Sequence, residues 1–281
     1  MYKICFVCTN FNNSHYTESF VKSIENLSYR DENINIKVII VDNCSNNLDQ
    51  DNLIKISKLY SFVELIFNKE NLGYFKGLNV GLNYIKKNNI FPNYIIIGNN
   101  DLEFSETFIS QLLYNKDIFN YYPVISPNII TNDGEHQNPH VLKNISKVRE
   151  FIFDLYYTNY FLSKFILLLS KFTKKFTDRN DERYHNFPSE IYQGHGSCYI
   201  LGPLFLSNFD ELFAPTFLMS EEFFLSYQLK QKRFSIYYTP LIKVTHFGHA
   251  SLSNVPSRKI WNISKDSHKI YKKYLKIYNN I

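Results

Sequence analysis

The sequence contains little glycine, proline or cysteine, and these shortages exclude several classes of protein. Glycine and proline number nine each among 281 residues, which excludes collagen-like and low-complexity chains. Four cysteines are too few for a disulfide scaffold at this length. No apolar run reaches the roughly 18 residues that a membrane-spanning helix needs, and the N-terminus lacks the features of a signal peptide. We therefore expect a cytoplasmic chain with reduced thiols.

Hydrophobic and aromatic residues are abundant instead. They make up 44% and 17% of the chain, with 25 Phe and 22 Tyr against one Trp. Such a composition excludes intrinsic disorder, and the length fits one large domain or two closely packed ones. The formal charge of +5 is only mildly basic, so it gives no argument for a nucleic-acid partner.

Cys5 and Cys8 form a CxxC pair, which invites a zinc or redox interpretation. Both lie inside Lys3–Cys8, an apolar run typical of a buried strand. Residues three apart on a strand face opposite sides, so they cannot bind one metal ion. We expect two separate core cysteines.

The first hundred residues alternate between strand and helix patterns, which predicts βαβ units and a parallel sheet. The strands are expected at Lys3–Cys8, Ile36–Val41, Phe62–Phe67 and Tyr94–Ile97, and the helices at His15–Leu27, Leu53–Tyr60 and Tyr74–Lys87. In such sheets, ligands bind beyond the carboxyl ends of the strands. The polar residues that follow these strands are Thr9, Asn10, Asp42, Asn99, Asn100 and Asp101.

Two of these carboxylates are candidates for ligand contacts. Asp42 could accept hydrogen bonds from a base or ribose, or it could only cap its own loop. Asp101, with Asn99 on the same side of the chain, suits a hard cation such as Mg²⁺ or Mn²⁺, which takes oxygen ligands. Further along, Gly73 is expected in a tight turn, while Gly77 and Gly81 would share one helix face.

The second half is less regular. Helices are expected at residues 104–114, 220–231 and 258–278, and strands at 124–130, 197–201 and, as a pair around Pro240, 234–238 and 241–245. We divide the chain into residues 1–103, residues 104–250 with an insertion at about 141–189, and a C-terminal helix within 251–281.

Several of these segments together resemble family 2 glycosyltransferases. The resemblance spans about residues 3–251 and is carried by Thr9–Asn10, Val41–Ser45, Asn71–Gly81, Ile97–Asp101, Gly194–Cys198, Phe209–Phe213, Phe217–Glu222 and His246–Ser251. It implies the GT-A fold, an α/β fold with a mostly parallel, Rossmann-like central sheet flanked by helices, here with a helical insertion. The bacterial branch that builds surface polysaccharides, including rhamnosyltransferase-like members, is the most similar.

The resemblance also implies roles for individual residues. A nucleotide-diphospho-sugar donor would contact Thr9, Asn10, Asp42, Asn71, Gly73, Asn79, Asn99 and Asn100. Asp101 would be the main ligand of Mg²⁺ or Mn²⁺, with Asn99 in the place of the first Asp of the family's DxD motif. His246 matches a position that touches the metal or diphosphate in some members, although a His after a strand is also often simply buried. The acceptor would be a glycan, often lipid-linked.

Glu221 and Glu222 match the family's Glu-Asp pair, whose second member is the presumed general base of an inverting transfer. Glu222 shares a helix face with Leu218, Leu225 and Leu229, so we expect it to be partly desolvated. The competing interpretation is a helix cap, with Ser220 at the N-cap and acidic residues in the first turn.

The insertion contains a basic amphipathic segment at Phe161–Phe176. One side would carry Phe161, Phe165, Leu168, Leu169, Phe172 and Phe176, and the other Lys164, Ser170, Lys171, Lys174 and Lys175, with Leu167 out of place. Such a helix either covers the core or lies in the plane of a membrane. The resemblance favours the membrane, and hence a peripheral position on the inner face of the cell membrane.

Two alternative functions remain at this point. A sugar-phosphate nucleotidyltransferase has a related fold, but it would need a glycine-rich, arginine-containing loop that Thr9–Asn13 does not offer. A catalytically inactive, membrane-associated module that binds nucleotide-sugars is the other alternative, since Asn99 and Glu222 depart from the family pattern.

Overall fold

The computed structural model describes residues 2–28, 34–172, 181–248 and 257–279. The last four residues of the expected amphipathic segment, at positions 173–176, lie outside these ranges. So does the end of the His246–Ser251 motif, from position 249 onward.

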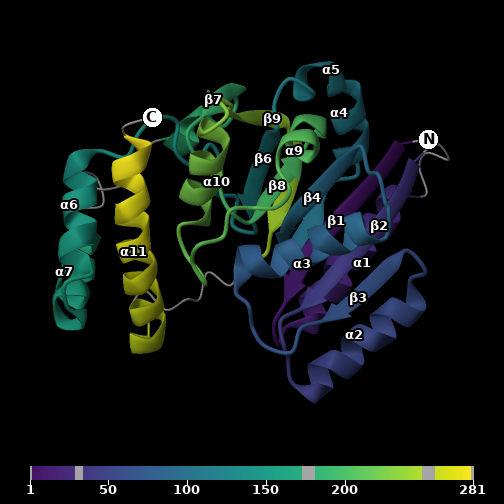
Figure 1. The fold of residues 1–281 in the computed structure, drawn as a ribbon, viewed down its shortest axis with the longest axis horizontal. Coiled ribbons are helices and arrows are strands. Elements are labelled where there is room, and N and C mark those ends of the chain that lie inside the picture. Colours follow the sequence, from purple (N-terminus) through teal and green to yellow (C-terminus); the bar gives the residue numbers. More distant parts are fainter. Residues whose placement is uncertain (1, 29–33, 173–180, 249–256, 280–281) are drawn as a thin grey trace.

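The described strands form one nine-stranded mixed sheet at the centre of the molecule (Figure 1). Its order is β3-β2-β1-β4-β8-β6-β9-β5, and β7 pairs with β9 beside this path. The parallel half comprises β1 (Tyr2–Asn10), β2 (Ile34–Asp42), β3 (Val63–Phe67) and β4 (Tyr94–Asn99). Both halves of the predicted division contribute strands to this sheet.

Helices cover both faces of the sheet, as expected for the α/β class. One core contains side chains of α1 (Ser14–Ser28), α2 (Asn47–Leu59), α4 (Phe108–Tyr114) and α5 (Lys116–Phe119). The opposite core contains side chains of α3 (Tyr74–Lys87), α9 (Pro203–Asn208) and α10 (Glu221–Lys230). Cys8 belongs to the first core and Cys5 to the second, which confirms that the CxxC pair is split across the sheet.

The remaining strands are β5 (Leu102–Phe104), β6 (Val124–Thr131), β7 (Ser189–Ile191), β8 (Cys198–Leu201) and β9 (Ile236–His246). The expected strand pair around Pro240 is wrong, because β9 runs through this proline as one strand. Its pairing with β6 shifts so that Thr239 faces Pro127 and Lys243 faces Asn128. Pro240 therefore falls in an irregularity, where its missing N–H breaks no ladder bond.

The rest of the insertion forms α6 (Lys147–Tyr156), α7 (Tyr160–Phe172) and a short 3₁₀ helix, η1 (Asp181–Tyr184). Helices α6 and α7 lie beside α11 (Arg258–Tyr278) at one end of the molecule, away from the sheet (Figure 1). α11 packs on α10 through Phe223, Phe224, Tyr271 and Leu275. None of the helices in the described ranges combines the length and hydropathy that crossing a bilayer requires.

Candidate functional site

The parallel strands bring the predicted polar residues to one edge of the sheet. In the ladder between β1 and β2, Asn10 lies opposite Asp42. In the ladder between β1 and β4, Thr9 lies opposite Asn99. This edge is formed by the carboxyl ends of three adjacent strands, where open α/β sheets bind ligands.

Three of these residues are used for internal hydrogen bonds. The Asn10 amide donates to Asp42 Oδ1 at 3.0 Å and to Asp49 Oδ2 at 2.7 Å. The Asp42 carboxylate, which is fully buried, also accepts from the backbone N–H of Ser45 at 3.0 Å. Asn100 points into the same interior, where its amide donates to Thr17 Oγ1 at 2.7 Å. In this structure they hold the strand-end loops in place, and the loop-capping interpretation of Asp42 fits its contacts.

Asn99, Asp101 and His246 form a separate group at the same edge. His246 is the last residue of β9 and pairs with Leu102 of β5, which places its ring beside Asp101. Its Nε2 atom lies 3.3 Å from Asp101 Oδ1 and 3.3 Å from Asn99 Nδ2. Asp101 and His246 are both buried.

The hydrogen bonds of His246 show what this group lacks. Its Nδ1 atom lies 2.8 Å from Gln137 Oε1, and because that oxygen only accepts, Nδ1 carries the proton. The amide of Asn99 can only donate to Nε2, so this nitrogen presents a lone pair. Asp101 Oδ1 therefore faces an acceptor, and this buried oxygen has no hydrogen-bond donor among the described residues. A cation between the two atoms would satisfy both.

The group can supply only part of a metal coordination sphere. Within the described part of the chain, no three His, Cys, Asp or Glu side chains lie close enough to hold a metal ion by themselves. Mg²⁺ and similar cations in phosphate-binding sites often use one or two protein ligands and take the others from water and substrate phosphates. Asp101 and His246 fit such a site.

The start of α3 is built for close packing. Asn71 Oδ1 accepts from the backbone N–H of Gly73 at 2.9 Å, and Gly73 has a positive φ of 83°. A Cβ at Gly73 would collide with the backbone carbonyl of Phe217. One turn later, a Cβ at Gly77 would lie 2.7 Å from Thr9 Cγ2, so this glycine lets α3 approach β1.

Asn79 connects α3 to the segment after α9. Its amide donates to the backbone carbonyl of Leu212 and its oxygen accepts from the N–H of the same residue, each at 2.8 Å. In this structure Asn79 therefore positions the chain that leads to α10.

The turn before α10 has a strained backbone. Met219 and Ser220 have φ values of 75° and 67°, in the left-handed region that non-glycine residues rarely adopt. Ser220 occupies the N-cap position and both glutamates lie in the first turn, as the helix-cap interpretation expects, but the Ser220 side chain makes no capping hydrogen bond. Strain of this kind persists where the surrounding structure enforces it, often at functional sites.

The strained turn places two carboxylates side by side. Glu221 is buried, and this burial, together with the charge of Glu222, raises its pKa to about 8. The sequence pattern pointed to Glu222 as the desolvated member, but the structure shows that Glu221 is the more buried one. Since the helix buries residues on several sides, its periodicity could not separate the two. Burial thus favours the protonated form of Glu221, while Glu222 is less buried and faces a cavity.

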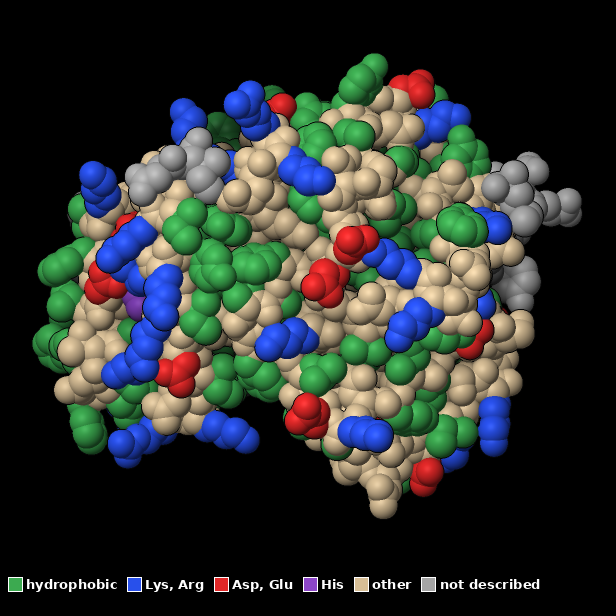
Figure 2. All heavy atoms as spheres, in the orientation of Figure 1, with side chains coloured by type: hydrophobic (Ala, Val, Ile, Leu, Met, Phe, Trp, Pro, Cys, Tyr) green, Lys and Arg blue, Asp and Glu red, His purple; other side chains and the backbone are tan. Residues whose placement is uncertain are grey.

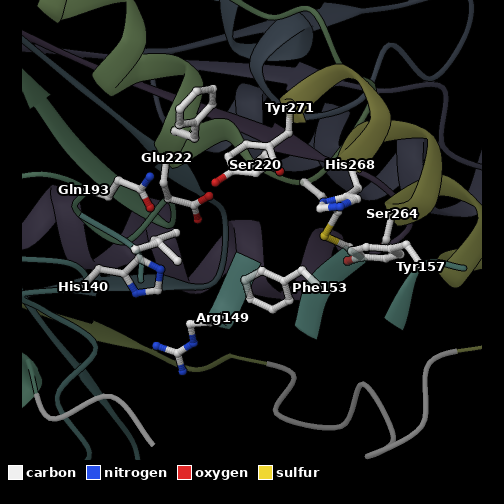
Figure 3. Close-up of a pocket in the computed structure, with 13 residues that line it drawn as sticks. His140, Arg149, Phe153, Tyr157, Gln193, Ser220, Glu222, Ser264, His268 and Tyr271 are labelled. Atoms are coloured by element: carbon white, nitrogen blue, oxygen red, sulfur yellow. The ribbon is translucent and has the colours of Figure 1, made fainter. Parts of the chain in front are cut away.

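Glu222 faces a cavity of about 290 Å³ between α10, α6 and α11 (Figure 3). The polar lining includes His140, Arg149, Gln193, Glu222, His268 and Tyr271, and the aromatic lining Phe153, Tyr157 and Phe223. The Tyr271 hydroxyl, buried beside this cavity, has no hydrogen-bond partner in the described part of the chain. A ligand with hydroxyl groups would supply one.

The loop before β8, which the sequence analysis did not single out for a role, connects the two parts of the site. Tyr74 Oη donates to the backbone carbonyl of Gly196 at 2.8 Å, and the N–H of Gly196 donates to Glu222 Oε1 at 3.2 Å. A Cβ at Gly196 would lie 2.7 Å from that carboxylate oxygen. Burial and nearby carboxylates, including Glu221, Glu222 and Asp101, raise the pKa of Tyr74 well above its usual value. Only the Gly-His-Gly sequence at 194–196 hinted at this close approach.

Comparison with known sequences finds one family. The profile of the family described as Glycosyl transferase family 2 matches residues 5–181. A Haemophilus influenzae protein described as an uncharacterized glycosyltransferase is 36% identical over 76 residues, which cover 27% of this chain and 22% of that protein. The chain thus aligns with about a fifth of the length of this curated relative.

Solved structures share the fold at low sequence identity. Mannosyltransferase PcManGT from Pyrobaculum calidifontis, in complex with GDP-Man and Mn²⁺, has a TM-score of 0.56 at 12% identity, over 97% of this chain and 64% of that one. S. aureus TarS 1-349 in complex with UDP-GlcNAc has a TM-score of 0.52 at 14% identity, over 90% and 61%. GalNAc-T7 with UDP, GalNAc and Mn²⁺ has a TM-score of 0.51 at 12% identity, over 88% and 44%. These likenesses confirm the predicted GT-A fold.

Proposed function

The chain belongs to glycosyl transferase family 2, and on that basis we propose that it transfers a sugar from a nucleotide-diphospho-sugar to a hydroxyl group of a glycan, with inversion at the anomeric carbon. The observation that carries the proposal is the arrangement of two complementary groups. Asp101 and His246 pair with each other at the strand ends, and Glu222 contacts the N–H of Gly196, whose carbonyl accepts from Tyr74. A diphosphate leaving group needs a cation, which Asp101 and His246 would hold. An attacking hydroxyl needs a base, which Glu222 would supply.

On the donor side, Thr9, Asn71 and Asn99 border the carboxyl ends of the strands, where the nucleotide would lie. Asp101 and His246 would hold a divalent cation, and when bound this ion acts as a Lewis acid that neutralises the diphosphate. The imidazole ligand favours Mn²⁺ over Mg²⁺, because Mg²⁺ is bound almost entirely by oxygen. The Mn²⁺ in the PcManGT and GalNAc-T7 structures supports this choice.

On the acceptor side, the cavity beside Glu222 would hold the sugar that is extended. Phe153, Tyr157 and Phe223 offer aromatic surfaces to the apolar face of a sugar ring, and Tyr271 offers a hydroxyl for hydrogen bonding. Glu222 would accept the proton of the attacking hydroxyl as that oxygen approaches the anomeric carbon. Burial raises the pKa of Glu221, and in its protonated form this residue would limit the negative charge next to the base.

The position of this cavity supports a proposal for the class of acceptor. Two of its aromatic walls are Phe153 of α6 and Tyr157, the residue that follows this helix in the insertion. An acceptor joined to a large or lipid-anchored carrier could enter from that side. This supports a surface-polysaccharide or lipid-linked glycan, with the rhamnosyltransferase-like branch of the family as one specific prediction.

The experiment is a screen for donor hydrolysis and transfer with UDP-, GDP- and dTDP-sugars in the presence of Mn²⁺. We expect wild type to hydrolyse one donor slowly and to transfer its sugar when an acceptor is present. Glu222→Gln should lower the transfer rate by about 10²–10⁴-fold and leave the affinity for the nucleotide unchanged, because the base contacts the acceptor. The matched variant is Glu221→Gln, which should lose less. Absence of hydrolysis with every donor would favour an inactive binding module, and the reverse order of the two variants would assign the base to Glu221.

A further inference from the structure

Helix α7 turns its hydrophobic side away from the protein. Phe161 and Phe165 are 75% and 56% exposed, and Leu168 and Leu169 on the same side are also exposed. Ser163, on the other side, is only 1% exposed. An amphipathic helix of a globular protein normally has its apolar stripe against the core. The alternative interpretation, in which this helix covers the core, is therefore wrong for the described residues.

Helix α6 also turns its hydrophobic side away from the protein. Val148, Phe151, Ile152 and Leu155 follow the i, i+3, i+4, i+7 spacing of one helix face, and all four are exposed, Phe151 by 61%. No residue of α6 is buried. Two neighbouring helices thus present apolar faces that the described part of the protein does not cover. We call their exposed apolar residues the α6–α7 surface; they are Val148, Phe151, Ile152, Leu155, Phe161, Phe165, Leu168 and Leu169.

Polar contacts attach these helices to the rest of the molecule. Asp154 on α6 lies 2.8 Å from His268 Nε2, within hydrogen-bond distance, and it forms an ion pair with Lys272 of α11 at 2.8 Å. Trp261 Nε1 donates to the backbone carbonyl of Tyr156, and Lys265 Nζ to that of Thr158. The polar side of α6 is thus directed at α11, which leaves its apolar side facing outward.

Positive charge lies beside the α6–α7 surface. Helix α7 contains two Lys and no acidic residue, and α11 contains seven Lys and Arg against one Asp. These two helices therefore carry net charges of +2 and +6, more than the +5 of the whole chain, while α6 has two acidic and two basic residues. Figure 2 shows a column of Lys and Arg over α11, next to hydrophobic side chains at the edge formed by α6 and α7.

We propose that the α6–α7 surface docks onto an anionic lipid bilayer. The Phe and Leu side chains would lie below the lipid headgroups, as in helices that bind in the plane of a membrane. The cations of α11 and α7 would attract the anionic lipids, and each Lys or Arg near such a surface adds to the affinity. A second copy of the chain is a poorer occupant, because it would bring two strongly positive surfaces together.

The proposal concerns membrane contact and does not depend on the proposed activity. Its failure would leave the donor and cation sites unchanged, since none of the residues of the α6–α7 surface is among them. If it holds, α6 would lie between the lipid and Glu222, because Phe153 and Tyr157 line the cavity beside that carboxylate. A lipid-anchored acceptor would then reach the base directly from the bilayer.

The test is flotation with vesicles of phosphatidylcholine, with and without phosphatidylglycerol. Wild type should float with the anionic vesicles, less so at high salt because salt screens the attraction. A triple variant with Phe161→Ser, Phe165→Ser and Leu168→Ser should bind at least about tenfold more weakly, since burial of each apolar side chain favours binding. All three side chains are exposed, so the fold should persist, and circular dichroism checks it.

The control removes apolar side chains of similar exposure elsewhere. Phe91, Tyr114 and Tyr121 lie outside α6, α7 and α11 and are all largely exposed. Replacing these three by serine should leave flotation unchanged. The proposal is overturned if wild type does not float with anionic vesicles, or if both triple variants lose binding equally. It is also overturned if sedimentation equilibrium shows a dimer that only the α6–α7 variant dissociates, while neither protein floats.

Discussion

The buried carboxyl group of Glu221 should make the stability of the protein depend on pH. Its pKa is raised from 4.5 to about 8 by burial and by the neighbouring Glu222. In the unfolded chain the same group titrates near its ordinary value. The folded state therefore binds this proton more tightly, so the free energy of unfolding is highest at low pH and falls as pH rises from about 4.5 to about 8.

The magnitude follows from the size of the shift. At about 1.4 kcal/mol for each pH unit, the contribution lost by pH 8 is on the order of 5 kcal/mol at most. Glu221→Gln removes the titration and keeps the shape. It should match wild type near pH 5 and be the more stable protein at pH 8.5, by several kcal/mol or roughly 10 °C in melting temperature.

The assay is thermal unfolding of wild type and Glu221→Gln at a series of pH values, with the difference in melting temperature as the readout. Using the difference cancels the titration of groups that do not interact with Glu221, so it reports Glu221 together with its neighbour Glu222. Glu135→Gln, at an exposed position, reports what any Glu→Gln change does. A difference for Glu221→Gln that stays constant from pH 5 to pH 9 would refute the reasoning, because the proton would not be held by burial at this position.

Three other substitutions test the rest of the site. Asp101→Ala should abolish the tighter binding of UDP or GDP that Mn²⁺ gives over chelator in calorimetry; equal affinities for wild type would exclude the cation. Tyr271→Phe removes a buried hydroxyl without a partner, so denaturant unfolding should show a gain of about 1 kcal/mol, while transfer to the acceptor falls. Gly73→Ala should cost about 2–4 kcal/mol, because it combines a positive φ with a backbone collision, and an unchanged stability would contradict both.

The strands and helices of the parallel half of the fold could be predicted from the sequence. Each buried strand is a continuous apolar run, and helix α3 is bounded by Gly73 and by the end of its apolar period, so its predicted limits are those observed. The positions of Asp42 and Asp101 at one edge follow from parallel pairing alone. β9 was read as two strands because Pro240 normally ends a strand, and only its pairing with β6 shows otherwise.

The sequence could not predict which way the sides of a helix face in the folded protein. The apolar stripe of α7 was predicted, but a stripe does not say whether it faces protein or another environment. The same limit applies to Glu221 and Glu222, which differ in burial because of where α10 packs. Tyr74 joins the site through its contact with Gly196, which lies 122 positions further along the chain, and no local sequence pattern predicts such a contact.

The contact between Gly73 and the carbonyl of Phe217 has a consequence for how related chains can diverge. It joins the turn that opens α3 to the segment that opens α10, with no space for a side chain between them. The two halves of the molecule are therefore spaced by two backbones in direct contact. Among homologues, an insertion or deletion just before the paired glutamates should occur together with a different residue at the position of Gly73, so the two segments should evolve in concert.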